Sequence, residues 1–270
     1  MTDVPTGGAA SRAQDPPGPA RAHALALDPA ALRPFLRDPD WLDAARDAVA
    51  ADPAALPRRF ALAGRRAGRG PLHPVADPSG VVHGTADDAA RAALVVALAT
   101  VATGEITTSA IAAPELAALL TTLYDEGDTA ERRGVLRGLD ALAVRGTLPE
   151  PLVTAGIPLA EDALRANDTS LVAAGAGPFG GRHLDAHTWR HAVLKLVFLG
   201  VPLDAVAHLA ERADAELARM ARDLAAERRA AGRDVPPDLA RLLGGLPAGA
   251  VPPAGTSTTT NSPAPRTTKE

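Results

Sequence analysis

The sequence predicts an all-α fold of stacked helical hairpins resembling a HEAT or armadillo-like solenoid, with an irregular helical bundle as the competing architecture. Apolar residues recur at helical spacing along most of the chain, and no strand-period run of any length appears. About ten helical segments follow one another in pairs of roughly 35 to 40 residues, and glycine–aspartate punctuation recurs between them.

Composition indicates one packed domain with a tail at each end. The chain has 270 residues, of which 46% are hydrophobic and 3% aromatic, so alanine, leucine and valine must fill the core. Residues 1–26 and 246–270 are rich in small, polar and proline residues without periodicity, and we expect them to be disordered. The helical domain is expected over 27–245.

Charge and residue usage exclude several classes of function. The net charge of -4 gives no overall attraction to nucleic acid or anionic lipid, although all but two of the 28 basic residues are arginine. The absence of cysteine excludes disulfides, thiolate nucleophiles and cysteine-bound metal. The apolar run 92–102 is too short to span a bilayer, and residues 1–24 lack the apolar segment of a secretory signal. We therefore expect a cytoplasmic protein without a cofactor.

Three Asp-Pro pairs predict the starts of the first helices. An aspartate accepts a hydrogen bond from a free helix N–H, and a proline at the next position has no N–H to leave unpaired. The pairs begin at Asp28, Asp38 and Asp52 and predict helices over 29–36, 39–51 and 53–67. Residues 69–84 contain several prolines and glycines and predict a loop.

The middle of the chain predicts a central helix over 86–102, because it is apolar nearly all round and follows Thr85, a good N-cap. A short helix is expected around 105–111. Leucines then recur at helical spacing from Leu116 to Leu123 and predict a helix that closes at Gly127.

A helix over 129–145 should follow its N-cap, Asp128. Its leucines and Val135 face inward, and Arg133 and Arg137 are expected on the outer face.

The next region is interpreted as broken by Pro149, Pro151 and Pro158, with short helices over 159–166 and 169–174. Residues 175–180 satisfy the G-x-G-x-x-G pattern of dinucleotide-binding folds, but no strand precedes them. We interpret this stretch as a flexible loop between helices.

The segment 178–229 organises the rest of the chain. Asp185 stands at an N-cap position and predicts a helix over 186–199, which Gly200 and Pro202 end. A second helix is expected over 203–231, interrupted near His208. A short helix over 238–243 completes the domain.

A histidine cluster is the first candidate site. His183, His187 and His191 are spaced at four, and the last two share one helical face, a spacing that metal sites use. No His-Glu-x-x-His motif is present, and Asp185 is already needed as a cap. We therefore expect solvated or core-edge histidines that form a polar cluster around Trp189, with a metal site as the alternative.

An arginine cluster is the second candidate. Five guanidinium groups fall within 58–69, and clustered arginines can bind phosphate or carboxylate through two parallel hydrogen bonds. The alternative is a solvated helix face. Nucleic acid is disfavoured because aromatic residues are sparse.

Three stretches carry a family resemblance: HLDAHTWRHAVLK over 183–195, FLGVPL over 198–203 and ERADAELARM over 211–220, with upstream extensions to the arginine cluster and to ERRGVLR over 131–137. In these stretches the sequence resembles the EboA family. The resemblance implies a part in moving a biosynthetic metabolite precursor. The chain departs from the family at Arg190 and His191, where members often carry Asn and Gln.

We therefore expect a non-catalytic binding or scaffold protein of secondary metabolism, whose partners are a small-molecule precursor or the products of neighbouring genes. The alternatives are an enzyme, possibly metal-dependent, that acts through the histidine cluster, and a structural protein that nucleates a complex. The expected binding groove contains Arg58, Arg59, Arg65, Arg69, Arg165, Asn167, His183, His187, Trp189, His191 and Lys195.

Overall fold

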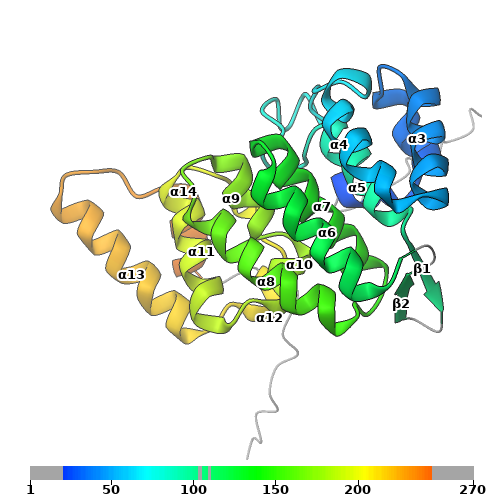
Figure 1. Ribbon diagram of the computed structural model, residues 1–270. Helices are drawn as coiled ribbons and strands as arrows, with labels where there is room; N and C mark the ends of the chain where they lie inside the picture. Colours follow the sequence, from blue (N-terminus) through cyan, green and yellow to red (C-terminus); the bar gives the residue numbers. More distant parts are fainter. Residues whose placement is uncertain (1–20, 103–104, 109–110, 245–270) are drawn as a thin grey trace, which may run out of the picture.

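A computed structural model describes residues 21–102, 105–108 and 111–244, most of which are helical (Figure 1). The all-α fold class is confirmed. The helices are α1 Arg21–Leu27, α2 Pro29–Leu32, α3 Pro39–Ala51, α4 Leu56–Arg66, α5 Ala86–Val96, α6 Ala113–Glu126, α7 Thr129–Arg145, α8 Glu150–Arg165, α9 Thr169–Gly175, α10 Pro178–His183, α11 Ala186–Phe198, α12 Leu209–Arg212, α13 Ala215–Ala230 and α14 Pro237–Leu243. Short 3-10 turns lie at Arg33–Phe35, Pro53–Ala55 and Leu203–Ala205.

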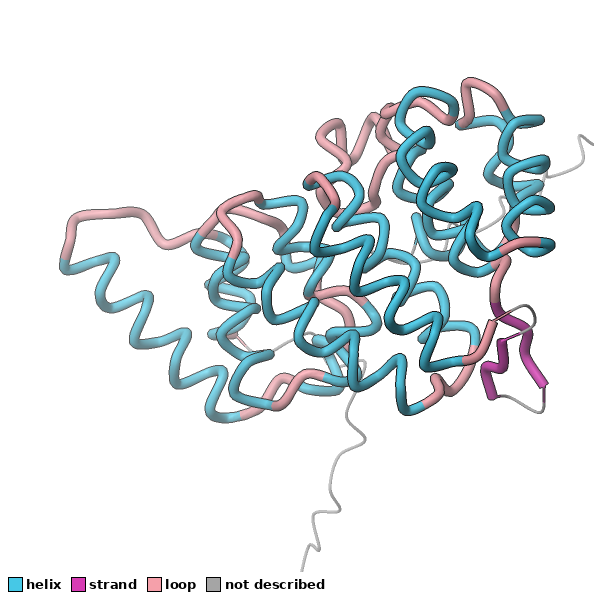
Figure 2. The backbone as a smooth tube through the Cα atoms, viewed as in Figure 1, coloured by secondary structure: helices cyan, strands magenta, loops and turns pink. Residues whose placement is uncertain are grey.

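The helices stack as pairs. Helix α4 packs on α5, α6 on α7 and α8 on α9, while α5, α7 and α9 contact one another in turn and α6 contacts α8 (Figure 2). Each pair buries an apolar face that neither helix could cover alone. The structure therefore contains stacked helical hairpins, and their assignment to the HEAT or armadillo type stays a prediction.

Aspartate caps begin the first helices, as predicted. The side chain of Asp28 accepts a hydrogen bond from the backbone N of Ala31 at 3.1 Å, and that of Asp38 accepts one from Trp41 at 3.1 Å. Asp52 caps the 3-10 turn Pro53–Ala55, which leads directly into α4. Each carboxylate satisfies an N–H that has no partner within its own helix.

Helix α5 is central but shorter than predicted. All of its residues are buried, and it packs against α1, α3, α4 and α7. It ends at Val96, and the chain continues as strand β1 Ala99–Ala102, which pairs antiparallel with β2 Glu105–Thr108. The helix expected over 86–102 therefore ends six residues early, and the short helix expected around 105–111 is wrong over its described residues 105–108. The β-branched valine, isoleucine and threonines of this stretch favour extended backbone, which outweighs its apolar helical pattern.

Two arginines of α7 that were expected on its outer, solvent-exposed face are largely buried instead. The Arg137 side chain is 2% exposed and pairs with Asp140, and the Arg133 side chain is 14% exposed and pairs with Asp88 of α5. Helix α7 is covered on several sides, by α1, α5, α6, α9 and α10. Buried guanidinium groups are tolerated because these carboxylates neutralise them.

Two segments that were expected to be broken or flexible are helical. Helix α8 is continuous through Pro158, so the break expected at this proline is absent; the carbonyl that loses its intrahelical donor belongs to Thr154, which is exposed. The stretch 175–180 is not a flexible loop, because α9 runs to Gly175 and α10 begins at Pro178. Proline suits the first helical position, where its absent N–H would have no partner.

Helix α1 includes residues that were expected in the N-terminal tail. It begins at Arg21, and Ala22, His23 and Ala26 are buried against α5 and α7. Small alanines let it pack closely, so the helical part starts earlier than residue 27. Residues 1–20 and 245–270, which contain the rest of the expected tails, lie outside the described residues.

The C-terminal helices follow the prediction in part, because the helix expected over 203–231 is divided into the 3-10 turn Leu203–Ala205, α12 and α13. Asp185 caps α11 through the backbone N of Thr188 at 2.9 Å, and Gly200 takes a left-handed φ of 75° just after that helix. His208 has a φ of 58° and separates the turn Leu203–Ala205 from α12. Helix α13 extends from one end of the molecule and packs on α14 (Figure 1).

None of the described helices is both long enough and apolar enough to cross a membrane.

Candidate functional site

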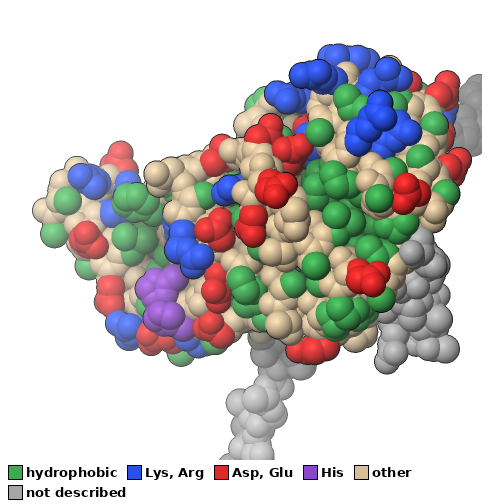
Figure 3. All heavy atoms as spheres, in the orientation of Figure 1, with side chains coloured by type: hydrophobic (Ala, Val, Ile, Leu, Met, Phe, Trp, Pro, Cys, Tyr) green, Lys and Arg blue, Asp and Glu red, His purple; other side chains and the backbone are tan. Residues whose placement is uncertain are grey.

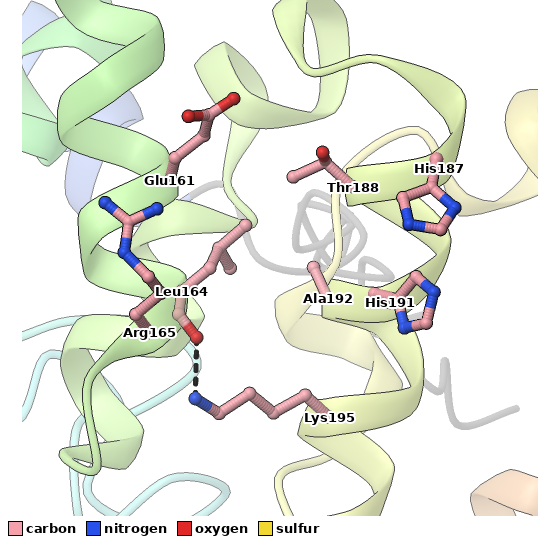
Figure 4. Close-up of a pocket in the computed structure, with 8 residues that line it drawn as sticks. All are labelled: Glu161, Leu164, Arg165, His187, Thr188, His191, Ala192 and Lys195. Carbon is pink, nitrogen blue, oxygen red and sulfur yellow. Dashed lines mark hydrogen bonds between the residues drawn. The ribbon is translucent and has the colours of Figure 1, made fainter.

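A hollow of about 340 Å³ lies between α8 and α11. Its lining side chains, drawn in Figure 4, are Glu161, Leu164, Arg165, His187, Thr188, His191, Ala192 and Lys195. They combine apolar surface with charges of both signs, a hydroxyl and two imidazoles. A few polar groups beside apolar surface are typical of small-molecule sites, and the volume lies at the lower end of their usual range.

Helical spacing brings the α11 residues to this hollow. Thr188, His191, Ala192 and Lys195 recur at three- and four-residue intervals and so lie on one side of the helix. The Asp185 cap fixes where that helix begins, and its interaction with Thr188 lowers the pKa of the Asp185 carboxyl. In Figure 4, Thr188 and Lys195 extend toward α8, while the two imidazoles lie further around α11.

Lys195 joins the two walls of the hollow. Its Nζ donates to the carbonyl oxygens of Leu164 at 2.6 Å and Ala166 at 2.9 Å, at the C-terminal end of α8. These carbonyls have no partners within their own helix, and the end of the helix dipole favours a cation. Lys195 therefore holds α8 and α11 together and places positive charge at the edge of the hollow.

His187 and His191 are neighbours, with ring centroids 4.4 Å apart and ring planes inclined by 58°. Among the described residues, no group of three His, Cys, Asp or Glu side chains is placed to hold a metal ion. His183 does not complete such a group, since it ends α10 and packs on Phe179 with ring centroids 4.8 Å apart. Burial lowers the pKa of the His183 imidazole.

Trp189 lies in the core instead of the hollow. Its side chain is 1% exposed, and the Arg212 guanidinium carbon lies 4.7 Å from the ring centroid. Arg212 also donates to the carbonyls of Gly181 at 2.6 Å and Leu184 at 2.9 Å. Trp189 thus helps anchor α12 to the end of α10. Its expected place in the groove is wrong, because the large apolar indole is buried.

The expected arginines occupy separate places. Arg165 lines the hollow and lies 3.7 Å from Asp162, whereas Asn167 is exposed beyond the end of α8. Arg58, Arg59 and Arg65 belong to α4, which packs on α3 and α5. The expectation of one shared groove is therefore wrong: His187, His191 and Arg165 line one hollow, and the α4 arginines do not join them.

Arg69 lines a second hollow, of about 400 Å³, at the N-terminal ends of α5, α7 and α9. Arg133 is fixed beside it, with its Nε 2.7 and 2.8 Å from the two carboxylate oxygens of Asp88 and its NH1 3.0 Å from the Ser170 hydroxyl. Asp128 and Asp168 also line this hollow, but both cap helices. Its charges are therefore largely committed to holding the three helix ends together.

Sequence reasoning missed four residues of the first hollow, Glu161, Leu164, Thr188 and Ala192. Thr188 and Ala192 share the helical face of His191, so their spacing would have identified them. Leu164 shares a face of α8 with Glu161, but nothing local in the sequence indicates that α8 lies against α11.

Comparison with known protein families gives a match over much of the chain. The sequence model of a family described as "Metabolite traffic protein EboA" matches residues 82–244. This match includes both walls of the hollow between α8 and α11 and begins after α4. No curated protein and no solved structure matches the chain.

Proposed function

Because this chain belongs to the EboA family of metabolite traffic proteins, we propose that it binds a small biosynthetic precursor in the hollow between α8 and α11. It acts in the cytoplasm as a non-catalytic carrier or scaffold in secondary metabolism and passes the precursor to the products of neighbouring genes. One observation carries the proposal: a single hollow, inside the matched region, is lined by His187, His191, Arg165 and Lys195.

The lining suits a ligand with oxygen-bearing groups on a small apolar body. Each imidazole can offer a hydrogen-bond donor and, when neutral, an acceptor, while Thr188 offers a hydroxyl and Glu161 an acceptor. The side chains of Leu164 and Ala192 supply apolar contact beside them. Cations from both walls, Arg165 and Lys195, favour a ligand with a partial or full negative charge.

The arrangement favours binding over catalysis. A histidine that acts as a general base is usually oriented by a third group, which hydrogen-bonds its second nitrogen. Among the described residues, neither His187 nor His191 has a hydrogen bond to a carboxylate, and Asp185 is engaged by Thr188. We therefore keep the enzyme as the alternative outcome of the test.

Native mass spectrometry tests the proposal. The full chain is incubated with the small-molecule extract of cells that express the neighbouring biosynthetic genes, and is compared with His187→Ala/His191→Ala and with Arg222→Ala. Arg222 is an exposed arginine on α13, away from the hollow, and serves as the matched control.

The expected result is one compound bound to the parent chain and to Arg222→Ala, with about tenfold less bound to the double histidine variant. Its mass should be the same in the extract and after release from the protein. A changed mass would identify an enzyme. Equal binding by all three proteins, or no bound compound, would contradict the proposed site.

A further inference from the structure

The outward face of α4 carries four arginines in two rows. Arg58 and Arg65 are seven residues apart, as are Arg59 and Arg66, so each row follows the helix over two turns, about 10 Å. Between the rows lies Leu62, which is partly buried against the core. The opposite face, with Leu56, Phe60, Ala63 and Gly64, is buried. This surface, the α4 arginine face, appears as a group of blue side chains in Figure 3.

Little negative charge neutralises the α4 arginine face. Arg66 pairs with Asp38 at 2.6 Å, but among the described residues Arg58, Arg59 and Arg65 form no ion pair with a carboxylate. Two further arginines add to the positive charge. Arg37 donates to the backbone carbonyl of Arg65 at 3.2 Å, and Arg69 lies so close to α4 that a Cβ on Gly64 would be 2.8 Å from its Nε.

This concentration of like charge contrasts with the net charge of -4 for the whole chain. Adjacent guanidinium groups repel one another, and only Arg65 and Arg66, in the last turn of α4, gain from the helix dipole. A binding partner that carries carboxylates would relieve that repulsion and form charge-assisted, paired hydrogen bonds with the guanidinium forks.

We infer that the α4 arginine face docks an acidic segment of a partner protein, with carboxylates that follow the two arginine rows. The rows extend along a helix instead of converging on a point, so they match charges spread along a polypeptide. Solvent-exposed charge pairs of this kind mainly raise the rate of association and select the partner. Their contribution to affinity weakens as the salt concentration rises.

Other anionic partners fit this face less well. Single-stranded nucleic acid is usually bound by aromatic side chains on which bases stack, and Phe60 of α4 is buried. A helix that lies on a membrane inserts its own apolar face, whereas the apolar face of α4 is packed into the core.

The inference is independent of the proposed function. Helix α4 precedes the matched residues 82–244, and its arginines do not line the hollow between α8 and α11. Loss of metabolite binding would therefore leave this docking surface untouched, and loss of docking would leave the hollow intact.

Fluorescence anisotropy tests it with a labelled helical peptide of glutamate and alanine, glutamate being placed every three or four residues. The parent chain is compared with Arg58→Glu/Arg65→Glu and with Arg222→Glu/Arg229→Glu. The second pair lies on α13, is exposed and has the same seven-residue spacing, so the change in net charge and geometry is matched. Urea unfolding of each protein checks that folding is preserved, and Arg58→Gln/Arg65→Gln replaces the reversal variant if it unfolds.

We expect the peptide to bind the parent chain, with affinity that falls as salt is added and drops about tenfold or more in the α4 variant. The α13 variant should bind as the parent does, apart from a small general effect of charge. Equal losses in both variants, or no binding by the parent, would overturn the inference. Tighter binding of phosphatidylserine vesicles or of single-stranded DNA through the same arginines would also overturn it.

Discussion

The Nζ of Lys195 on α11 lies 2.6 Å from the carbonyl oxygen of Leu164 on α8 and so bridges the two helices that form the candidate site. The same ammonium donates to Ala166 at 2.9 Å. It therefore supplies two of the hydrogen bonds that the C-terminal end of α8 lacks, and a structural contact defines one edge of the hollow.

Replacing Lys195 with methionine should lower the free energy of unfolding by about 1 to 3 kcal/mol. Methionine keeps most of the stem but leaves the carbonyls of Leu164 and Ala166 without their charged donor. Urea unfolding monitored by circular dichroism measures the change. Arg222→Met on α13 should change stability by less than about 0.5 kcal/mol, and equal effects of the two substitutions would contradict the bridging role.

Arg133→Met should destabilise the fold more strongly, by about 3 to 5 kcal/mol. The Asp88 side chain is 0% exposed, so its carboxylate would be left buried without the guanidinium that neutralises it. The double variant Arg133→Met/Asp88→Asn removes both charges and should recover part of the loss. If that double-mutant cycle gave additive effects, Arg133 and Asp88 would not be coupled.

Gly177→Ala should destabilise the protein by about 1 to 3 kcal/mol, because the added Cβ would overlap the buried carboxylate of Asp140. That carboxylate accepts a hydrogen bond from the backbone N of Phe179 at 2.9 Å and cannot move without leaving α10 uncapped. Thermal unfolding measures the effect. Gly70→Ala is the control, since nothing lies within 4 Å of its added Cβ. If Gly70→Ala lowered the melting temperature as much as Gly177→Ala does, the steric explanation would be refuted.

Two buried groups make opposite contributions to stability in acid. Burial, with the charge of Arg137, lowers the pKa of His23 to about 4 from 6.5. As pH falls below 6.5 the unfolded chain binds a proton that the folded chain does not, so His23 reduces stability. Burial raises the pKa of Asp140 to about 6 from 3.8. Between those values the folded chain retains a proton that the unfolded chain releases, so Asp140 increases stability as pH falls.

Variants should separate these contributions. As pH falls from 6.5 to 4, Asp140→Asn should lose more stability than the parent chain, and His23→Leu should lose less. The free energy of unfolding in urea, measured across this pH range, gives the difference between each variant and the parent. Differences that do not change with pH would contradict the assignment to these two groups.

Local chemistry was sufficient to predict many helix boundaries. Asp28, Asp38 and Asp185 each accept a hydrogen bond from the residue three positions later, so their caps are visible in the sequence. Within the predicted loop 69–84, the Asp77 carboxylate accepts hydrogen bonds from the backbone N atoms of Val81, Val82 and His83, four to six positions away. Such signals need no knowledge of how the helices pack.

Distant contacts account for the errors. Arg133 was expected in solvent because its partner, Asp88, is 45 residues away in sequence. The groove was expected to include Trp189 and the α4 arginines, because proximity between helices is set by packing that no local pattern encodes. The contact between α8 and α11, which creates the hollow, is also made by residues far apart in the sequence, so no local pattern indicates it.

Hydrogen–deuterium exchange most directly tests whether the hollow between α8 and α11 binds the precursor. The full chain is compared with and without the small-molecule extract of cells that express the neighbouring genes. We predict slower exchange in peptides that cover 161–167 and 187–195, and no such slowing in His187→Ala/His191→Ala. Unchanged exchange in both peptides, or protection confined to other helices, would contradict the account.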